Sequence, residues 1–368
     1  MSGIVISKTT AGLKDGNHAL IGKLATPLKM YIMNESDAAA KEDGPAKWLC
    51  THDTSNRFAE SAVGEARSAG LELVHEGDAA PSYGRSEVDY STIKMYQFMR
   101  KEIITAEEIE DSRGEVSASM KRQLKRMTRD YYVTRNNLAA FLMANGTKKE
   151  AYFGTQILPI GAPNDNPLFY KSHPVGLDGD TQSNIFYSTR ASGANIDRAI
   201  VEEMMNHAAV KLSGMQTNDG QALGYYPDTI VIPGNNPKLI KAVKQAVGSE
   251  LTDNGSGAAA NGINIQAGNW NIIILPQWKA AEGACPMIFM SSAAREDLGG
   301  NMMYTRKQLA VRDWIDDDTW NYCWNARARL GIGHHTYKHA IYFESLANGT
   351  TTLTDGQTAS TAATQITL

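Results

Sequence analysis

The sequence contains little cysteine. Cys50, Cys285 and Cys323 are the only thiols in 368 residues, and none of them belongs to a CxxC pair. An odd number of widely spaced cysteines predicts neither a disulfide framework nor a structural zinc site. We therefore expect synthesis in a reducing cytoplasm.

Long apolar runs are missing as well. No stretch approaches the roughly 18 apolar residues of a membrane-spanning helix. Residues 1–10 also lack the basic segment and apolar run of a signal peptide. We expect a protein that is neither exported nor associated with a membrane.

Neither sign of charge is in large excess. The formal net charge is -4 at pH 7, which gives no general attraction to nucleic acid or to an anionic membrane. Any contact with DNA must therefore be local.

The motifs of common enzyme classes are absent from the sequence. It contains no GxxxxGK[ST] phosphate loop, no GxGxxG after a strand and no GxSxG elbow. His334, His335 and His339 are metal-binding residue types, but they follow strand-like sequence and lack the acidic partner of an HExxH motif. We expect no catalytic residue, metal or cofactor, and a metal-dependent enzyme built on these histidines is the less favoured alternative.

What the chain does have is the composition of a folded protein, with 42% hydrophobic and 21% charged residues. Its length exceeds the roughly 300 residues at which a single core stops growing, so at least two packed units are expected. Residues 1–70 show little periodicity and predict an extended arm that lies on another surface. Residues 71–104 predict a long hairpin with a polar tip, which needs support because an isolated hairpin is marginal in water.

The clearest periodic pattern predicts a helix over 115–146, about 45 Å long. Thr105 and Glu108 match a capping box for a short helix before it. The long helix also carries a basic stripe, which either faces solvent or contacts acidic groups of a neighbouring subunit or phosphate. Its apolar face consists of Val116, Met120, Leu124, Met127, Tyr131, Leu138 and Phe141 or Leu142, and its basic stripe of Lys121, Arg122, Lys125, Arg126 and Arg129.

The remaining pattern predicts an α+β fold. Residues 147–195 read as irregular connections with short strands at PLFY and NIFYS, followed by a helix over 196–211. A strand, a helix, a loop of small residues and further strands predict a compact α/β unit over 229–304. Aromatic-rich strands over 305–346 are expected to close a sheet, and the Thr- and Ala-rich tail over 347–368 is expected to be flexible or peripheral.

This order of elements resembles the major capsid proteins of tailed bacteriophages, which have the Hong Kong 97 (HK97)-like fold. The closest likeness is to the Mu-like head subunits, through a T-x-E-x-x-x-D entry at Thr105 to Asp111 and the segment PLFYKSHPVG. The resemblance implies an N-terminal arm at 1–70 and an E-loop hairpin at 71–104. It also implies a P-domain at 105–228 and 305–346, with the long helix as its spine, an inserted A-domain at 229–304 and a flexible tail at 347–368.

The resemblance also implies a function. Such a subunit assembles with itself through pentamers and hexamers into an icosahedral shell around double-stranded phage DNA, which it contacts non-specifically. The expected location is the virion, after assembly in the bacterial host cytoplasm. A separate scaffolding protein, a portal and a decoration protein are the implied partners, with no membrane. An encapsulin-like nanocompartment shell is the alternative within the same fold. We expect inter-subunit contacts at Glu72, Glu76, Asp78 and Arg85 of the hairpin and at Lys121, Arg122, Lys125 and Arg126 of the helix.

Overall fold

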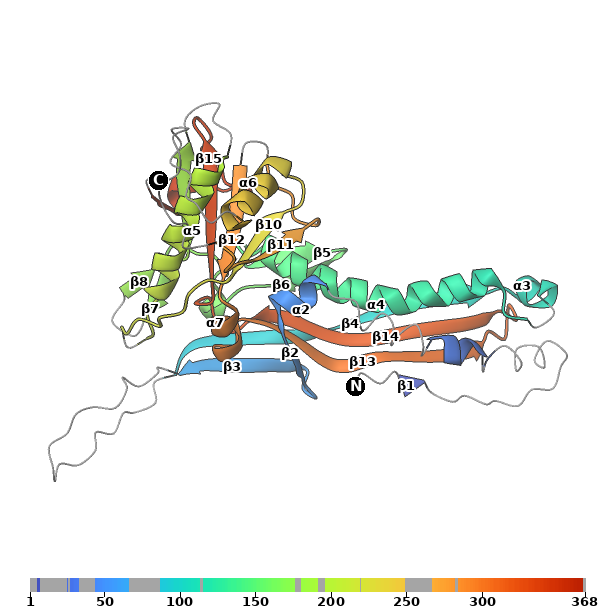
Figure 1. The fold of residues 1–368 in the computed structure, drawn as a ribbon. Helices are drawn as coiled ribbons and strands as arrows, with labels where there is room; N and C mark the ends of the chain where they lie inside the picture. The colour runs from blue at the N-terminus through green and yellow to red at the C-terminus, as the bar shows by residue number, and fades with distance from the viewer. Residues whose placement is uncertain are drawn as a thin grey trace, which may run out of the picture.

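The computed structural model describes 5–6, 25, 27–32, 44–65, 87–112, 115–175, 180–190, 196–218, 220–248, 267–281 and 284–366. These residues form an elongated unit, built from a long sheet and a long helix, and a second unit that stands upright at one end of it (Figure 1). Among the described helices, none is long and apolar enough to cross a membrane.

The elongated unit is built on a six-stranded sheet. Its strands lie in the order β1-β13-β14-β4-β3, and β2 also pairs with β13. The three longest strands form its antiparallel centre, in which Tyr322 pairs with both Ile104 and Ile315. The strands are β1 (Val5–Ile6), β2 (Thr51–Thr54), β3 (Ala59–Glu65), β4 (Glu87–Ile104), β13 (Asn301–Ile315) and β14 (Tyr322–His334).

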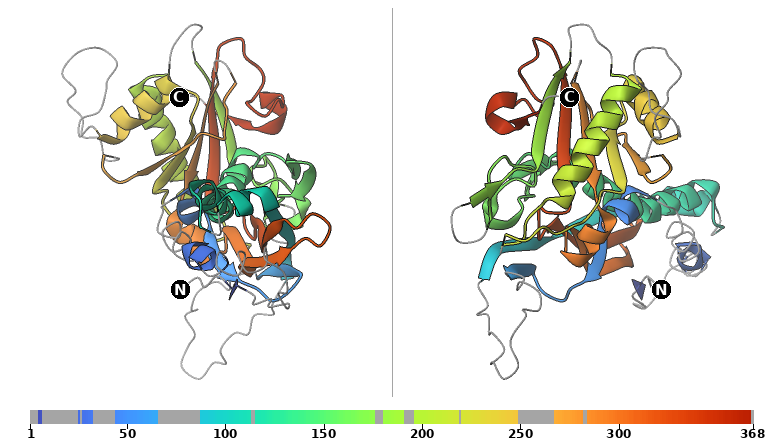
Figure 2. Two further views of the ribbon diagram at one scale, coloured as in Figure 1. Left: turned by 90° about the vertical axis from the view of Figure 1, so that its right-hand side faces the viewer. Right: turned by 60° about the vertical axis from the view of Figure 1, so that its left-hand side comes forward.

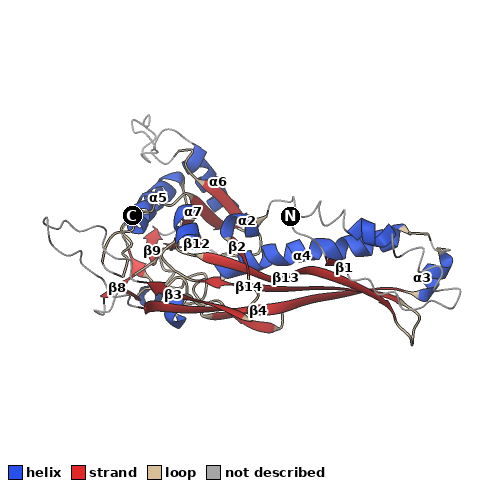
Figure 3. Cartoon of the chain, turned by 90° about the horizontal axis from the view of Figure 1, so that it is seen from below, coloured by secondary structure: helices blue, strands red, loops and turns tan. Residues whose placement is uncertain are grey.

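Helix α4 (Ala118–Ala144) runs along one face of this sheet (Figures 1 and 3). The hydroxyl of Ser117 caps it by accepting a hydrogen bond from the Met120 amide. Its apolar face packs as predicted, because Met120, Leu124 and Met127 join the sheet in one buried cluster. The short helix α3 (Ala106–Asp111) precedes it, and the Thr105 hydroxyl accepts from the Glu108 amide at 3.2 Å, which confirms the predicted cap.

The upright unit contains a second six-stranded sheet, in the order β11-β10-β12-β15-β9-β16. Two helices cover one of its faces, and the other face packs on the second half of α4 (Figures 1 and 2). The strand at 229–233, the helix after it and the strand at 271–275 confirm the sequence prediction. The elements are β9 (Ile185–Arg190), α5 (Arg198–Ser213), β10 (Thr229–Pro233), α6 (Pro237–Gly248), β11 (Asn271–Leu275), β12 (Ala284–Met290), β15 (Ala340–Ala347) and β16 (Thr364–Gln365).

Shorter elements connect these two units. The N-terminal helix α2 packs against α4, and Leu49 lies in the core that the two units share. The described connections are α2 (Pro45–Leu49), β5 (Glu150–Phe153), β6 (Gln156–Pro159), the 3-10 helix η1 (Pro163–Asp165), β7 (His173–Val175), β8 (Asp180–Gln182), α7 (Ser292–Asp297) and α8 (Ala359–Ala362).

Strand β15 lies in a different sheet from the one expected. The sequence predicted that 305–346 would close one sheet, but β13 and β14 belong to the first sheet and β15 to the second, between β12 and β9. Almost every residue of β15 is buried, on both faces. Such a strand needs a central place in a sheet that is covered on both sides, which the second sheet provides.

The hairpin also differs from the expectation. The predicted strand is present as β4, but its partner is β3 at 59–65, within the range expected to be the arm. Residues 71–86, which hold the predicted tip, lie outside the described residues.

The C-terminal segment packs on the molecule up to residue 366, contrary to the expected flexible tail. Leu353, Ala359 and Ala363 are buried in the main core, and β16 pairs with β9. In Figure 2 this segment lies on the opposite side of the second sheet from α6. Its alanines have little bulk, and this allows the chain to approach the sheet closely.

The segment PLFY at 167–170 is a loop and not the predicted strand. Leu168 and Phe169 are buried, but the side chain of Asn184 supplies the hydrogen bonds that a neighbouring strand would make. Its amide group donates to the Leu168 carbonyl at 2.7 Å and its oxygen accepts from the Tyr170 amide at 2.8 Å. These bonds satisfy the buried backbone of the loop.

Candidate interaction surfaces

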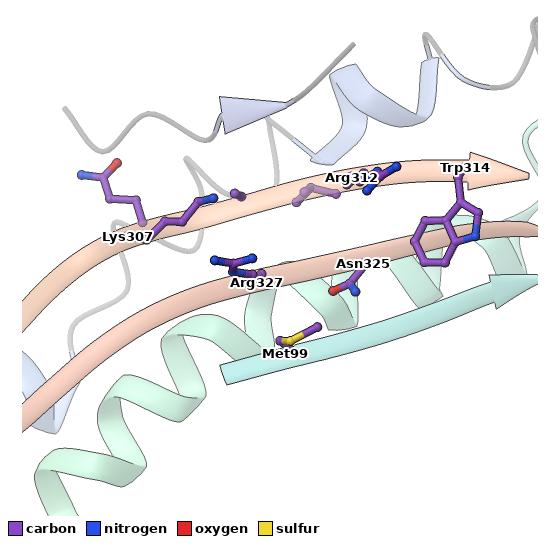
Figure 4. A pocket seen from close by; sticks show the side chains of 9 residues that line it. Met99, Lys307, Arg312, Trp314, Asn325 and Arg327 are labelled. Atoms are coloured by element: carbon purple, nitrogen blue, oxygen red, sulfur yellow. The ribbon is translucent and has the colours of Figure 1, made fainter. Parts of the chain in front are cut away.

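The face of the first sheet away from α4 carries a groove of about 600 Å³. Because side chains alternate along a strand, Leu309 points toward α4 whereas Arg312 and Trp314 point to the other face. Figure 4 shows Met99, Asn325 and Arg327 reaching the same groove from β4 and β14.

The groove combines an apolar floor with positive charge. Its nine described lining residues include the three cations Lys307, Arg312 and Arg327 and no carboxylate. The ammonium group of Lys101 also lies 5.2 Å from the centre of the Trp314 ring. This chemistry suits an extended segment that carries both apolar and acidic side chains.

The basic stripe lies on the exposed face of α4, as predicted. At 100° per residue, its five cations fall within an arc of about 140°, nearly opposite the apolar face that packs on the sheet. All five side chains are exposed, and the Nε of Arg122 donates to the Ala118 carbonyl at 3.3 Å. The structure therefore brings these five cations together on one exposed surface, the basic face of α4, which consists of Lys121, Arg122, Lys125, Arg126 and Arg129.

The turn between β13 and β14, at 316–321, forms an acidic surface. Asp317 and Asp318 are exposed, and Trp320 is 44% exposed. Trp320 has a φ of 59°, a left-handed conformation that a bulky side chain rarely adopts. In the sequence, the string DDDTW between two predicted strands marks this turn.

Internal hydrogen bonds hold this turn in one shape. The Trp320 amide donates to the Asp316 carbonyl at 2.8 Å, and the Thr319 hydroxyl donates to the Asp316 carboxylate at 2.6 Å. The side-chain oxygen of Asn321 accepts from the Ala106 amide at 3.0 Å, so the turn is fixed to the start of α3.

The four hairpin residues expected at subunit contacts, Glu72, Glu76, Asp78 and Arg85, lie outside the described residues. Their placement stays a prediction.

Comparisons with known proteins point to one kind of fold. No protein-family model matches the sequence, and no curated protein matches it either. The capsid of Ralstonia phage GP4 is similar in structure, with a TM-score of 0.50 and 12% identity over 82% of this chain and 87% of that chain. This chain has the HK97-like capsid fold.

Two further structures give lower scores. The capsid of the cyanophage P-SCSP1u aligns with a TM-score of 0.48 and 10% identity, over 81% of this chain and 86% of that chain. The capsid of an empty GTA particle aligns with a TM-score of 0.48 and 13% identity, over 83% of this chain and 91% of that chain. The 12% identity with the GP4 capsid shows the fold alone and does not by itself transfer a function.

Within the capsid fold, the three histidines of the alternative hypothesis lie at the join between the two sheets. His335 contacts two hydroxyl groups, that of Ser91 at 2.6 Å from Nδ1 and that of Tyr304 at 2.9 Å from Nε2. His334 and His339 are fully buried, and burial lowers the pKa of His339 to about 3 and that of His334 well below its usual value. Over the described part of the chain, no group of three or more His, Cys, Asp or Glu is placed to hold a metal.

A buried carboxylate attaches the C-terminal segment to the capsid fold. Glu344 on β15 is fully buried and accepts from the Tyr342 hydroxyl at 2.5 Å and from the Thr354 amide and hydroxyl at 2.9 and 2.7 Å. Burial raises the pKa of Glu344 to about 7. The sequence analysis did not single out this residue, because nothing in the sequence shows that Thr354 returns to β15.

Proposed function

We propose that the chain is the major capsid protein of a tailed bacteriophage, a structural subunit without catalytic activity. The observation that carries this proposal is the capsid fold, which aligns over 82% of the chain with the capsid of Ralstonia phage GP4. Copies of the chain assemble through pentamers and hexamers into an icosahedral shell around double-stranded DNA.

Assembly of this kind depends on contacts between different surfaces of identical copies. Such heterologous contacts close into rings when the rotation between neighbours is right, and rings then close into a shell. No metal, cofactor or catalytic group takes part. The sheet groove, the basic face of α4 and the acidic turn are exposed surfaces of the kind that assembly requires.

We assign the domains on the same basis. The first sheet and α4 are the core of the P-domain, β4 leads into the E-loop hairpin, and the second sheet is the core of the A-domain. Because β9, β15 and β16 pair within the second sheet, we extend the A-domain beyond 229–304 to include them.

The proposed partner of the groove is the E-loop hairpin of a neighbouring copy. The hairpin sequence carries Glu72, Glu76 and Asp78 beside Leu71, Leu73 and Val74. Acidic and apolar side chains on one segment match the cations and apolar floor of the groove. Arg85 is expected to meet an acidic group on the same neighbour.

The other partners follow from the proposed role. DNA contacts the inner surface non-specifically, a separate scaffolding protein directs assembly, and a portal occupies one vertex. A decoration protein binds the outside, and no membrane takes part. Assembly takes place in the cytoplasm of the bacterial host, and the mature location is the virion.

Electron microscopy of the purified chain, followed by nuclease treatment and analysis of protected contents, tests the proposal. We expect uniform shells, rings or tubes from the purified chain, and shells that protect DNA when they are isolated from phage-producing cells. A monodisperse monomer at high concentration would contradict the capsid function. Shells from those cells that protect a protein cargo and no DNA would indicate the encapsulin-like alternative.

A further inference from the structure

We propose that the acidic turn at 316–320 of one copy binds the basic face of α4 on a second copy. This inference rests on the proposed shell function and names one of its contacts. Two exposed surfaces of the same chain support it. One is an acidic turn that contains a tryptophan and is held in shape by hydrogen bonds, and the other is a helix face on which arginines cluster.

The turn has the features of a contact segment. Asp317 and Asp318 present carboxylates to solvent, and Trp320 presents part of its indole ring. Exposed tryptophans are prominent among the residues that dominate protein interfaces. The hydrogen bonds to Asp316 and the tie from Asn321 to α3 fix the turn before binding, so little conformational entropy is lost on contact.

The basic face of α4 complements the turn in charge and in side-chain chemistry. Arg122, Arg126 and Arg129 lie on one side of the helix, and all three are exposed. A guanidinium group binds a carboxylate through two parallel hydrogen bonds and also stacks on an indole ring. An aspartate pair followed closely by a tryptophan offers both kinds of partner to neighbouring arginines.

The geometry indicates that the turn that binds the basic face belongs to a second copy. The turn continues β13 and β14, and the face of α4 that packs on those strands is the apolar one, with Met120 and Leu124. The basic face points away from the sheet, so the turn of the same copy lies on the wrong side to cover it. A contact between two different surfaces of identical copies is the type that closes into a ring.

Packaged DNA is the competing occupant of the basic face. The exposed carboxylates of Glu107 and Asp111 on α3 lie at the same end of the molecule as the basic face, and those of Asp317 and Asp318 lie there too. In a contact between copies, Asp317 and Asp318 of one copy supply the opposite charge to the basic face of the next, whereas DNA on that face would leave the acidic turn without a partner.

Charge reversal in the full-length chain tests the inference. We compare the unaltered chain with D317K/D318K, with R122E/R126E and with a chain that carries all four changes, and measure the critical concentration for shell formation by light scattering and microscopy. Each double variant should raise this concentration at least about tenfold, and the fourfold variant should restore assembly because the opposite charges meet again. Circular dichroism and thermal melting show whether each variant folds, and K241E/K244E on α6 is the matched control, expected to change the concentration less than about twofold.

A second variant distinguishes loss of the contact between copies from loss of folding. Trp320→Gly removes the indole and suits the left-handed backbone, so the chain should stay folded by circular dichroism while the critical concentration rises.

Three results would overturn the inference. The first is normal assembly of both double variants, and the second is failure of the fourfold variant to restore shells. The third is normal shells from R122E/R126E that lack only packaged DNA, which would assign the basic face to DNA. A monodisperse monomer from the unaltered chain at high concentration would instead contradict the proposed function.

Discussion

The two six-stranded sheets of this molecule are exposed to very different degrees. The second sheet is covered on both faces, and all seven residues of its strand β12 are buried. The first sheet is covered by α4 on one face, whereas the opposite face leaves Met99 and Ile103 more than 40% exposed. A sheet with both faces covered contributes mainly to folding, and a sheet with one open apolar face has surface left for another molecule.

The first prediction tests the comparison where the effect on stability is largest. Phe289 on β12 is fully buried and packs edge-on against Trp270, with ring centres 5.7 Å apart. Phe289→Ala should lower the free energy of unfolding by about 3–5 kcal/mol, measured by urea denaturation. Met99→Ala on the open face, where Met99 is 56% exposed, is the control and should cost less than about 1 kcal/mol. Equal losses in the two variants would contradict the division of roles between the sheets.

The second prediction concerns the C-terminal segment that helps to cover the second sheet. The pKa of Glu344 is raised from about 4.5 to about 7 in the folded chain, so folding favours its protonated form. Its contribution to stability is therefore full below pH 4.5 and is lost as the pH rises to about 7. The loss is on the order of 3 kcal/mol.

Glu344→Gln mimics the protonated carboxyl group and should remove this pH dependence. Urea denaturation at a series of pH values between 4.5 and 7.5 measures it for both chains. The same slope of stability against pH in the variant and the unaltered chain would show that another group is responsible.

The third prediction concerns the open sheet and has the smallest effect on stability. Reversing all four hairpin charges, at Glu72, Glu76, Asp78 and Arg85, should change the free energy of unfolding by less than about 0.5 kcal/mol, because the proposal assigns them to a contact between copies and not to the fold of one copy. It should nevertheless prevent shell formation, because the groove cations then face like charges. Unchanged assembly of this variant would show that these four charges do not contribute to contacts between copies.

Local patterns in the sequence predicted the elements whose structure is local. The helix over 115–146 was found because Met120, Leu124 and Met127 recur at helical spacing, and the same spacing placed the basic stripe on the exposed side. The predicted cap at Thr105 also depends on a residue only three positions away. The order of these elements then suggested the capsid fold.

Long-range pairing could not be read from the sequence in the same way. β15 has apolar residues on both faces, but nothing local says whether it pairs with β14 or with β12 and β9. The partner of β4 was similarly misplaced, because 59–65 has few of the bulky residues that mark a strand. The groove and the Glu344 contact depend on such pairings, which explains why sequence reasoning found the cations of α4 and missed these two sites.

Strand β4 has a mechanical consequence for a closed container. Its 18 residues extend over about 60 Å, with one bulge at Asp89, from the base of the hairpin to the residue before the cap of α3. Hydrogen bonds in an antiparallel pair run perpendicular to the strands, so a pull along β4 loads many bonds to β14 in parallel and not one after another. Tension between neighbouring subunits would thus be distributed over the part of the strand that pairs with β14, from Met95 to Ile104, and the molecule would resist stretching most strongly in that direction.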